Sequence, residues 1–82
     1  VPTVLAQDGF KVRILLPPWE HGPAHVHVYR AGALVLIDLP DRHRGARIRR
    51  IDGMKAADIV AAVRLVEANV AMLRREWRRY HA

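Results

Sequence analysis

The spacing of apolar residues changes once along this 82-residue chain, and that change limits the folds open to it. Residues 10–16 (FKVRILL) and 25–30 (HVHVYR) place side chains of different character at alternate positions, as half-buried β-strands do. From about residue 54 to about residue 80, apolar residues recur every three or four positions, which is typical of an amphipathic helix. The sequence therefore predicts a sheet followed by a helix.

Short turn signals join the expected strands. Asp8-Gly9 and Ala31-Gly32 each stand between two strand-like segments, where a two-residue hairpin turn fits. The segment after the second turn, residues 33–39 (ALVLIDL), is a more continuous apolar run and is typical of a central strand. Consecutive strands joined by such turns form an antiparallel meander.

These elements together predict an α+β fold, an antiparallel meander of four to five strands with one long C-terminal helix packed on one face. Residues 46–51 (ARIRRI) supply the last short strand. The sheet is expected at about residues 3–51 and the helix at about residues 54–80. The length suits a single domain over residues 1–82.

Composition narrows the setting in which the protein works. There is no cysteine, which excludes disulfides and thiolate metal sites and favours a cytoplasmic protein. No apolar run approaches the ~20 residues that a membrane-spanning helix needs, and the first residues do not resemble a signal peptide, so no membrane partner is expected. The formal net charge of +6 favours acidic partners, including nucleic acid. A general bias toward arginine in the composition could also produce this charge without any ligand.

Alternation assigns side chains to the two faces of the sheet. If the valines of HVHVYR face the helix, then His25, His27 and Tyr29 face outward, and Lys11 and Arg13 share their face. This outer face would be basic, aromatic and rich in histidine. Such a face suits either a ligand platform or a dimer interface.

Three roles for the histidines stay open on the sequence alone. His25 and His27, two positions apart on one strand face, could bind a metal with His21, but no carboxylate follows before Asp38, so no metal and no cofactor is favoured. The pair could act as general base and general acid in RNA cleavage. They could also be structural, which is the common role of strand histidines.

Four segments carry a family resemblance over nearly the whole chain. In order they are Pro2–Val4 (PTV), Glu20–Val28 (EHGPAHVHV), Gly53–Met54 and Met72–Trp77 (MLRREW). A chain with these segments resembles the small bacterial proteins of the domain of unknown function 4160 family. The resemblance implies a compact sheet-plus-helix domain and half of a two-gene, toxin–antitoxin-like pair, with no established chemistry.

The motif positions of the resemblance are His21, Pro23, His25 and His27. Ala24 departs from the family pattern, where a second proline is common, and this removes one fixed φ from the loop. The histidine spacing is unchanged by that departure. The recurrence of the motif implies a role for the histidines without identifying one.

The leading hypothesis is a component of a toxin–antitoxin-like module that binds nucleic acid, with an RNA-directed toxin as its enzymatic form. Its catalytic residues would be His25 and His27. Its nucleic-acid-binding residues would be Lys11, Arg13, Tyr29 and Arg30, with the arginines holding phosphate. A small cognate protein is the expected partner.

Two alternatives belong to other functional classes. One is a non-enzymatic protein-interaction module, a homo-oligomer or a binder of an acidic partner, anchored by Tyr29, Leu34 and Leu36 on the outer face. The other is a small metalloprotein that uses His21, His25 and His27. The sequence does not decide whether the protein is an enzyme.

Overall fold

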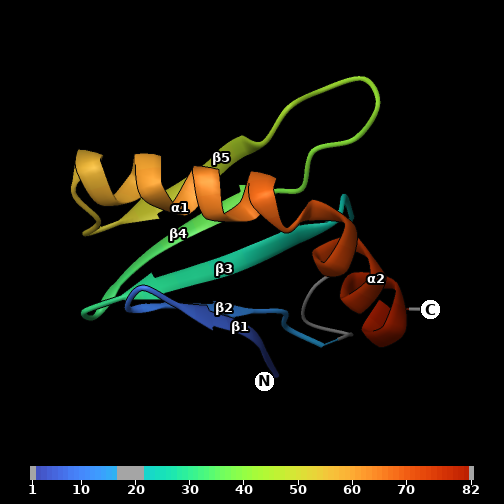
Figure 1. Ribbon diagram of the computed structural model, residues 1–82, viewed down its shortest axis with the longest axis horizontal. Coiled ribbons are helices and arrows are strands. Elements are labelled where there is room, and N and C mark those ends of the chain that lie inside the picture. The colour runs from blue at the N-terminus through green and yellow to red at the C-terminus, as the bar shows by residue number, and fades with distance from the viewer. Residues whose placement is uncertain (1, 17–21, 82) are drawn as a thin grey trace.

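The computed structural model describes residues 2–16 and 22–81, which form one five-stranded sheet and two helices (Figure 1). The elements, in chain order, are β1 (Thr3–Gln7), β2 (Phe10–Arg13), β3 (His25–Arg30), β4 (Ala33–Asp38), β5 (Arg47–Asp52), α1 (Ala56–Ala68) and α2 (Val70–His81). The predicted α+β class and the predicted strand-then-helix order are confirmed.

The sheet is a simple meander. Its strand order is β1-β2-β3-β4-β5, and every neighbouring pair is antiparallel, as predicted. Asp8-Gly9 and Ala31-Gly32 are the turns of the first and third hairpins, and all four residues have positive φ. Two central residues with positive φ match the right-handed twist of the strands that they join.

The core lies between one face of the sheet and the two helices. The side chains of Val12, Val26, Val28 and Val35 are all 0% exposed, and they share the core with Leu73 of α2. The valines of β3 therefore face the helices, which confirms the predicted assignment of the two sheet faces. In Figure 1, α1 runs along the sheet and α2 lies at one end of it.

The prediction of one long C-terminal helix is wrong, because the helix is interrupted at Asn69. The φ of Asn69 is −124° and its ψ is 20°, and its side-chain amide donates to the carbonyl of Leu65 at 2.8 Å. Asparagine side chains compete with the backbone in this way and are weak helix formers. The break is only one residue long, so the apolar spacing continues across it and does not reveal it.

The new direction of α2 after the break is held by contacts to the ends of strands. Arg74 Nε donates to the carbonyl of Pro40 at 2.9 Å, and His81 Nε2 donates to the carbonyl of Leu15 at 2.8 Å. Both acceptors lie just beyond the ends of strands, β4 and β2 respectively. These hydrogen bonds fasten α2 across the end of the sheet at which β3 begins.

Ala31 gives the first test of this fold. It has a φ of 48°, a conformation that costs an L-residue about 1 kcal/mol, and its side chain is exposed. We expect Ala31→Gly to raise the free energy of unfolding by about 0.5–1 kcal/mol in urea titrations, since glycine removes the strain at some cost in unfolded-state entropy.

Two matched variants control for this effect. Gly32→Ala should lower the free energy of unfolding, because its φ of 81° disfavours a side chain although nothing lies within 4 Å of the added Cβ. Ala57→Gly, on the exposed side of α1, should also lower it. A loss of stability in Ala31→Gly similar to that in Ala57→Gly would contradict the turn assignment.

Candidate functional site

The outer face of the sheet, on the side opposite the core, brings together most of the residues predicted to be functional. Strand pairing places Lys11 opposite Tyr29 and Arg13 opposite His27, and directly opposed residues point to the same side. His25, two positions before His27 on β3, shares this side. The structure therefore groups these five side chains as predicted.

The two histidines on this face are buried, contrary to the open face that alternation suggests. His25 is 1% exposed and His27 is 7% exposed. Their ring centroids lie 5.6 Å apart, and the ring of His25 lies 5.1 Å from that of Trp77 in α2. The break at Asn69 is what allows α2 to bring Trp77 to this end of β3.

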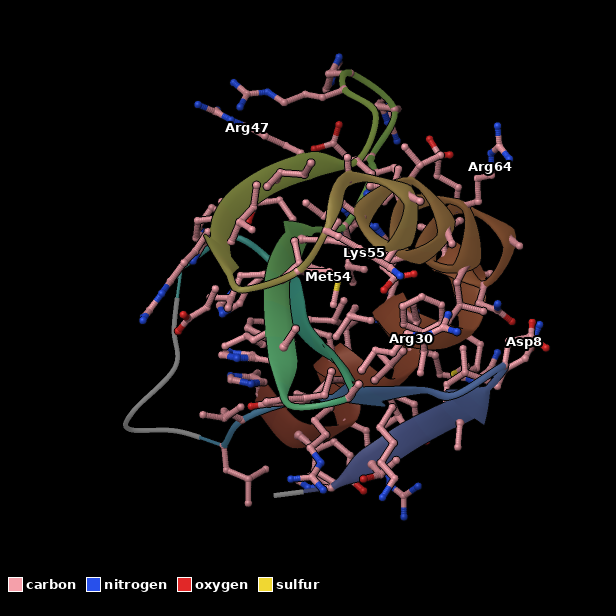
Figure 2. All side chains as sticks on the ribbon, turned by 90° about the vertical axis from the view of Figure 1, so that its left-hand side faces the viewer. Asp8, Arg30, Arg47, Met54, Lys55 and Arg64 are labelled. Atoms are coloured by element: carbon pink, nitrogen blue, oxygen red, sulfur yellow. The ribbon has the colours of Figure 1, made fainter. Side chains whose placement is uncertain are left out.

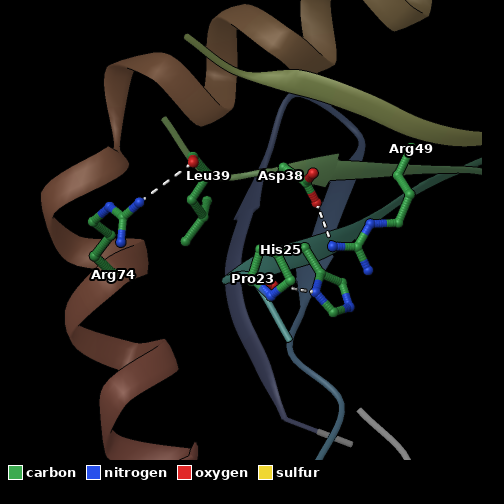
Figure 3. A network of polar contacts seen from close by, with 6 residues as sticks. All are labelled: Pro23, His25, Asp38, Leu39, Arg49 and Arg74. Carbon is green, nitrogen blue, oxygen red and sulfur yellow. Dashed lines mark hydrogen bonds and ion pairs between the residues drawn. The ribbon is translucent and has the colours of Figure 1, made fainter. Parts of the chain in front are cut away.

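The hydrogen bond of His25 determines which of its ring nitrogens carries a proton. Nδ1 lies 2.9 Å from the carbonyl oxygen of Pro23 (Figure 3). Because a carbonyl oxygen only accepts, Nδ1 must be the donor. The motif residues Pro23 and His25 thus fix the ring orientation at the start of β3.

Trp77 connects this corner to the C-terminal turn of α2. Its ring stacks on that of His81, with centroids 3.7 Å apart and planes 10° apart. Trp77 therefore lies between His25 and His81, and His81 is itself bound to the carbonyl of Leu15. Trp77 therefore has a structural role, because its ring joins the start of β3 to the last turn of α2.

The exposed part of the outer face is cationic and aromatic. Lys11 is exposed, Arg13 and Tyr29 are half-buried, and the guanidinium carbon of Arg13 lies 5.3 Å from the Tyr29 ring centroid. The Tyr29 ring also stacks with that of His27 at 6.4 Å. Among the described residues, no carboxylate forms an ion pair with Lys11 or Arg13, and the buried Nε of Arg13 has no hydrogen-bond partner.

A shallow pocket opens at these side chains. It has a volume of about 260 Å³. Its lining is formed by Gly9, Lys11, Arg13, Tyr29, Arg30, Ala31 and Gly32. The two hairpin turns thus lie beside the cations and Tyr29 in the lining of this pocket.

The guanidinium of Arg30 lies away from the outer face, on the helix side of the sheet (Figure 2). It lies 4.7 Å from the Phe10 ring centroid and 3.7 Å from a carboxylate oxygen of Asp58 in α1. Arg30 follows Tyr29 directly, so strand alternation already indicates the opposite face. The structure does not bring the guanidinium groups of Arg13 and Arg30 together.

The other end of the outer face holds an ion pair that the sequence reading missed. Asp38 of β4 lies opposite His25 in the sheet, and its Oδ1 is 2.7 Å from a guanidinium nitrogen of Arg49 in β5 (Figure 3). The contact is an ion pair by charge and distance, but its geometry is not that of a hydrogen bond, and this buried oxygen accepts none from the described residues. The signal in the sequence was an acidic residue at the end of one strand and an arginine-rich strand after it.

Asp41 shapes the loop after β4. Its carboxylate accepts hydrogen bonds from the backbone N–H groups of His43, at 2.7 Å, and Arg44, at 2.9 Å. These two bonds favour the charged form and lower the pKa of Asp41 below its usual value. His43 is exposed in this loop.

The metal hypothesis involves a residue outside the described part of the chain, His21. Residues 2–16 and 22–81 contain no group of three or more histidine, cysteine or acidic side chains placed to hold an ion. Within the same residues, no helix is long and apolar enough to cross a membrane.

Comparison with known families identifies a family for most of the chain. Residues 9–78 match the family model described as Domain of unknown function (DUF4160). The chain belongs to this family. No curated protein and no solved structure matches it. The DUF4160 match covers every residue of the outer face discussed above, from Lys11 to Trp77.

The ring orientation of His25 can be tested in solution. At about pH 8 an ordinary imidazole is neutral and carries its proton on one ring nitrogen. We expect two-bond proton–nitrogen correlation spectra to show that this nitrogen is Nδ1 in His25. His43, exposed in its loop, serves as the reference ring. A His25 ring without a proton on Nδ1 would contradict the bond to Pro23.

Proposed function

We propose that this DUF4160 protein is the component of a toxin–antitoxin-like module that binds single-stranded nucleic acid. The observation that carries the proposal is the group of Lys11, Arg13 and Tyr29 around one shallow pocket. Cations that follow a phosphate backbone, combined with an aromatic ring on which a base can stack, are the usual elements of such sites. The toxin–antitoxin-like module is the part of the proposal that rests on the family resemblance.

Lys11 and Arg13 are suited to phosphate because neither has a carboxylate partner among the described residues. Arg13 is also held over the Tyr29 ring, so its planar guanidinium is already partly oriented. These features support binding of phosphate at this face of the sheet.

Tyr29 is suited to stack with a base. Its ring lies nearly parallel to that of His27, with an interplanar angle of 17°, so one side of it is supported from within the face. Stacking on an aromatic side chain tolerates any base, since every base has a π-face. This predicts binding of single strands with little dependence on sequence.

Burial of the histidines favours binding over cleavage. The rings of His25 and His27 are 1% and 7% exposed, and a general base must come within hydrogen-bond reach of the proton that it removes. We therefore propose that the protein acts in the module by binding, with the histidines supporting the face. Catalysis by His25 and His27 is the competing form of the proposal.

Binding can be measured by fluorescence anisotropy with labelled single-stranded RNA of about ten nucleotides. We expect affinity to fall steeply between about 50 and about 200 mM salt, because bound phosphates release counterions. Arg13→Gln should reduce the slope of log affinity against log salt by about 0.7. Arg75→Gln, on the exposed side of α2, removes the same charge and should leave the slope unchanged.

Tyr29 should behave differently from Arg13 in the same assay. Tyr29→Ala is expected to cost about 1–3 kcal/mol of binding free energy with no change of salt slope. Circular dichroism and urea titration check that each variant is folded. Salt-independent binding, or equal losses in the Arg13 and Arg75 variants, would rule out this site.

Cleavage is tested separately on the same RNA. We expect the RNA to remain intact after incubation with the wild-type protein. We also expect induced expression to have the same effect on growth for the wild type and for a His27→Ala variant. Cleavage that is lost in a folded His25→Ala/His27→Ala double variant would instead establish the RNA-directed toxin.

A further inference from the structure

The last strand, β5, forms an open edge of the sheet on the far side from the proposed nucleic-acid site. It stands at the end of the strand order, and all six of its residues are exposed. Among the described residues, no strand pairs with its outer side. An open edge presents backbone donors and acceptors that a strand of another chain can pair with.

The side chains of β5 have two distinct characters. Ile48 and Ile51 pair with the buried Ile37 and Val35, so they lie on the helix side of the sheet, yet they are 42% and 51% exposed. On the outer side β5 carries three arginines, at positions 47, 49 and 50. A strand added here would meet apolar side chains on one face and cations on the other.

A second copy of this chain is a poor occupant of that edge. If two β5 strands paired antiparallel with Ile48 against Ile51, Arg49 and Arg50 of one copy would lie against the same two residues of the other copy. Four guanidinium groups would then meet on one face of the joined sheet. Like charges directly opposed across strands are destabilising, so the arginines act against self-pairing.

Nucleic acid is also a poorer fit than a protein strand. Arg49 contacts Asp38 at 2.7 Å and Arg50 contacts Asp52 at 3.3 Å, so part of the positive charge of β5 is neutralised for either kind of partner. A phosphate backbone would also leave unused the exposed isoleucines and the open backbone edge. These features are complementary to a peptide strand.

We propose that β5 is the docking edge for a strand of another protein, in which acidic residues alternate with apolar ones. The acidic side chains would contact the arginines of β5, and the apolar ones would cover Ile48 and Ile51. Backbone hydrogen bonds would supply affinity, and the charges would select the partner. This inference stands on β5 alone and does not depend on nucleic-acid binding.

The test uses blocked synthetic peptides in place of the unidentified partner. The first alternates glutamate and valine, the second has lysine for every glutamate, and the third is the acidic peptide with alternate backbone nitrogens methylated. We expect only the first to bind in fluorescence anisotropy and to protect the amides of residues 47–52 from hydrogen exchange. The lysine peptide isolates charge, and the methylated peptide isolates backbone pairing.

Variants locate the site on the protein. Arg50→Glu, at a side chain that is 65% exposed, should weaken the acidic peptide by about tenfold. Ile51→Thr should weaken it severalfold, whereas Arg75→Glu on α2 should have no effect. Circular dichroism confirms the fold, and RNA anisotropy on the same variants should be unchanged, which separates this proposal from the previous one.

Several results would overturn the proposal. No binding of the acidic peptide, equal binding of the methylated peptide, or protection outside residues 47–52 would remove the docking edge. Displacement of the peptide by RNA would assign the arginines to nucleic acid. A wild-type dimer in light scattering that dissociates in the Ile51→Thr variant would assign the edge to a second copy.

Discussion

The packing of the β3 valines against the two helices is the constraint on which the rest of this protein depends. Val26 and Val28 are fully buried, and strand alternation then leaves His25, His27 and Tyr29 only the opposite face. Neighbouring strands add Lys11 and Arg13 to that face through their register. The composition of the candidate site is therefore a consequence of how the core is filled.

The helix break at Asn69 divides the outer face into a covered end and an open end. It allows α2 to reach the start of β3, where Trp77 contacts His25 and Arg74 donates to the carbonyl of Pro40. At the other end, Tyr29 and the two cations stay accessible beside the hairpin turns. The histidines thus belong to the covered end, where they support the packing of the face. The cations belong to the open end, where a ligand can bind.

The strands, the turns and the two sheet faces could be predicted from the sequence because they depend on local rules. The period of two in HVHVYR assigns its faces, and Asp8-Gly9 and Ala31-Gly32 specify their turns. The burial of His25 could not be predicted, because it depends on a change of helix direction made by one asparagine. The place of Arg30 on the helix side was available from alternation alone.

The most direct test of nucleic-acid binding at this sheet face is a titration of nitrogen-15-labelled protein with single-stranded RNA, followed by amide chemical shifts. We expect the shifts to concentrate at Lys11, Arg13 and Tyr29 and in the turn at Ala31-Gly32, and we expect β5 and the exposed arginines of α2 to change little. Shifts concentrated on α2, or no shifts at low salt, would contradict the claim that this sheet face binds nucleic acid.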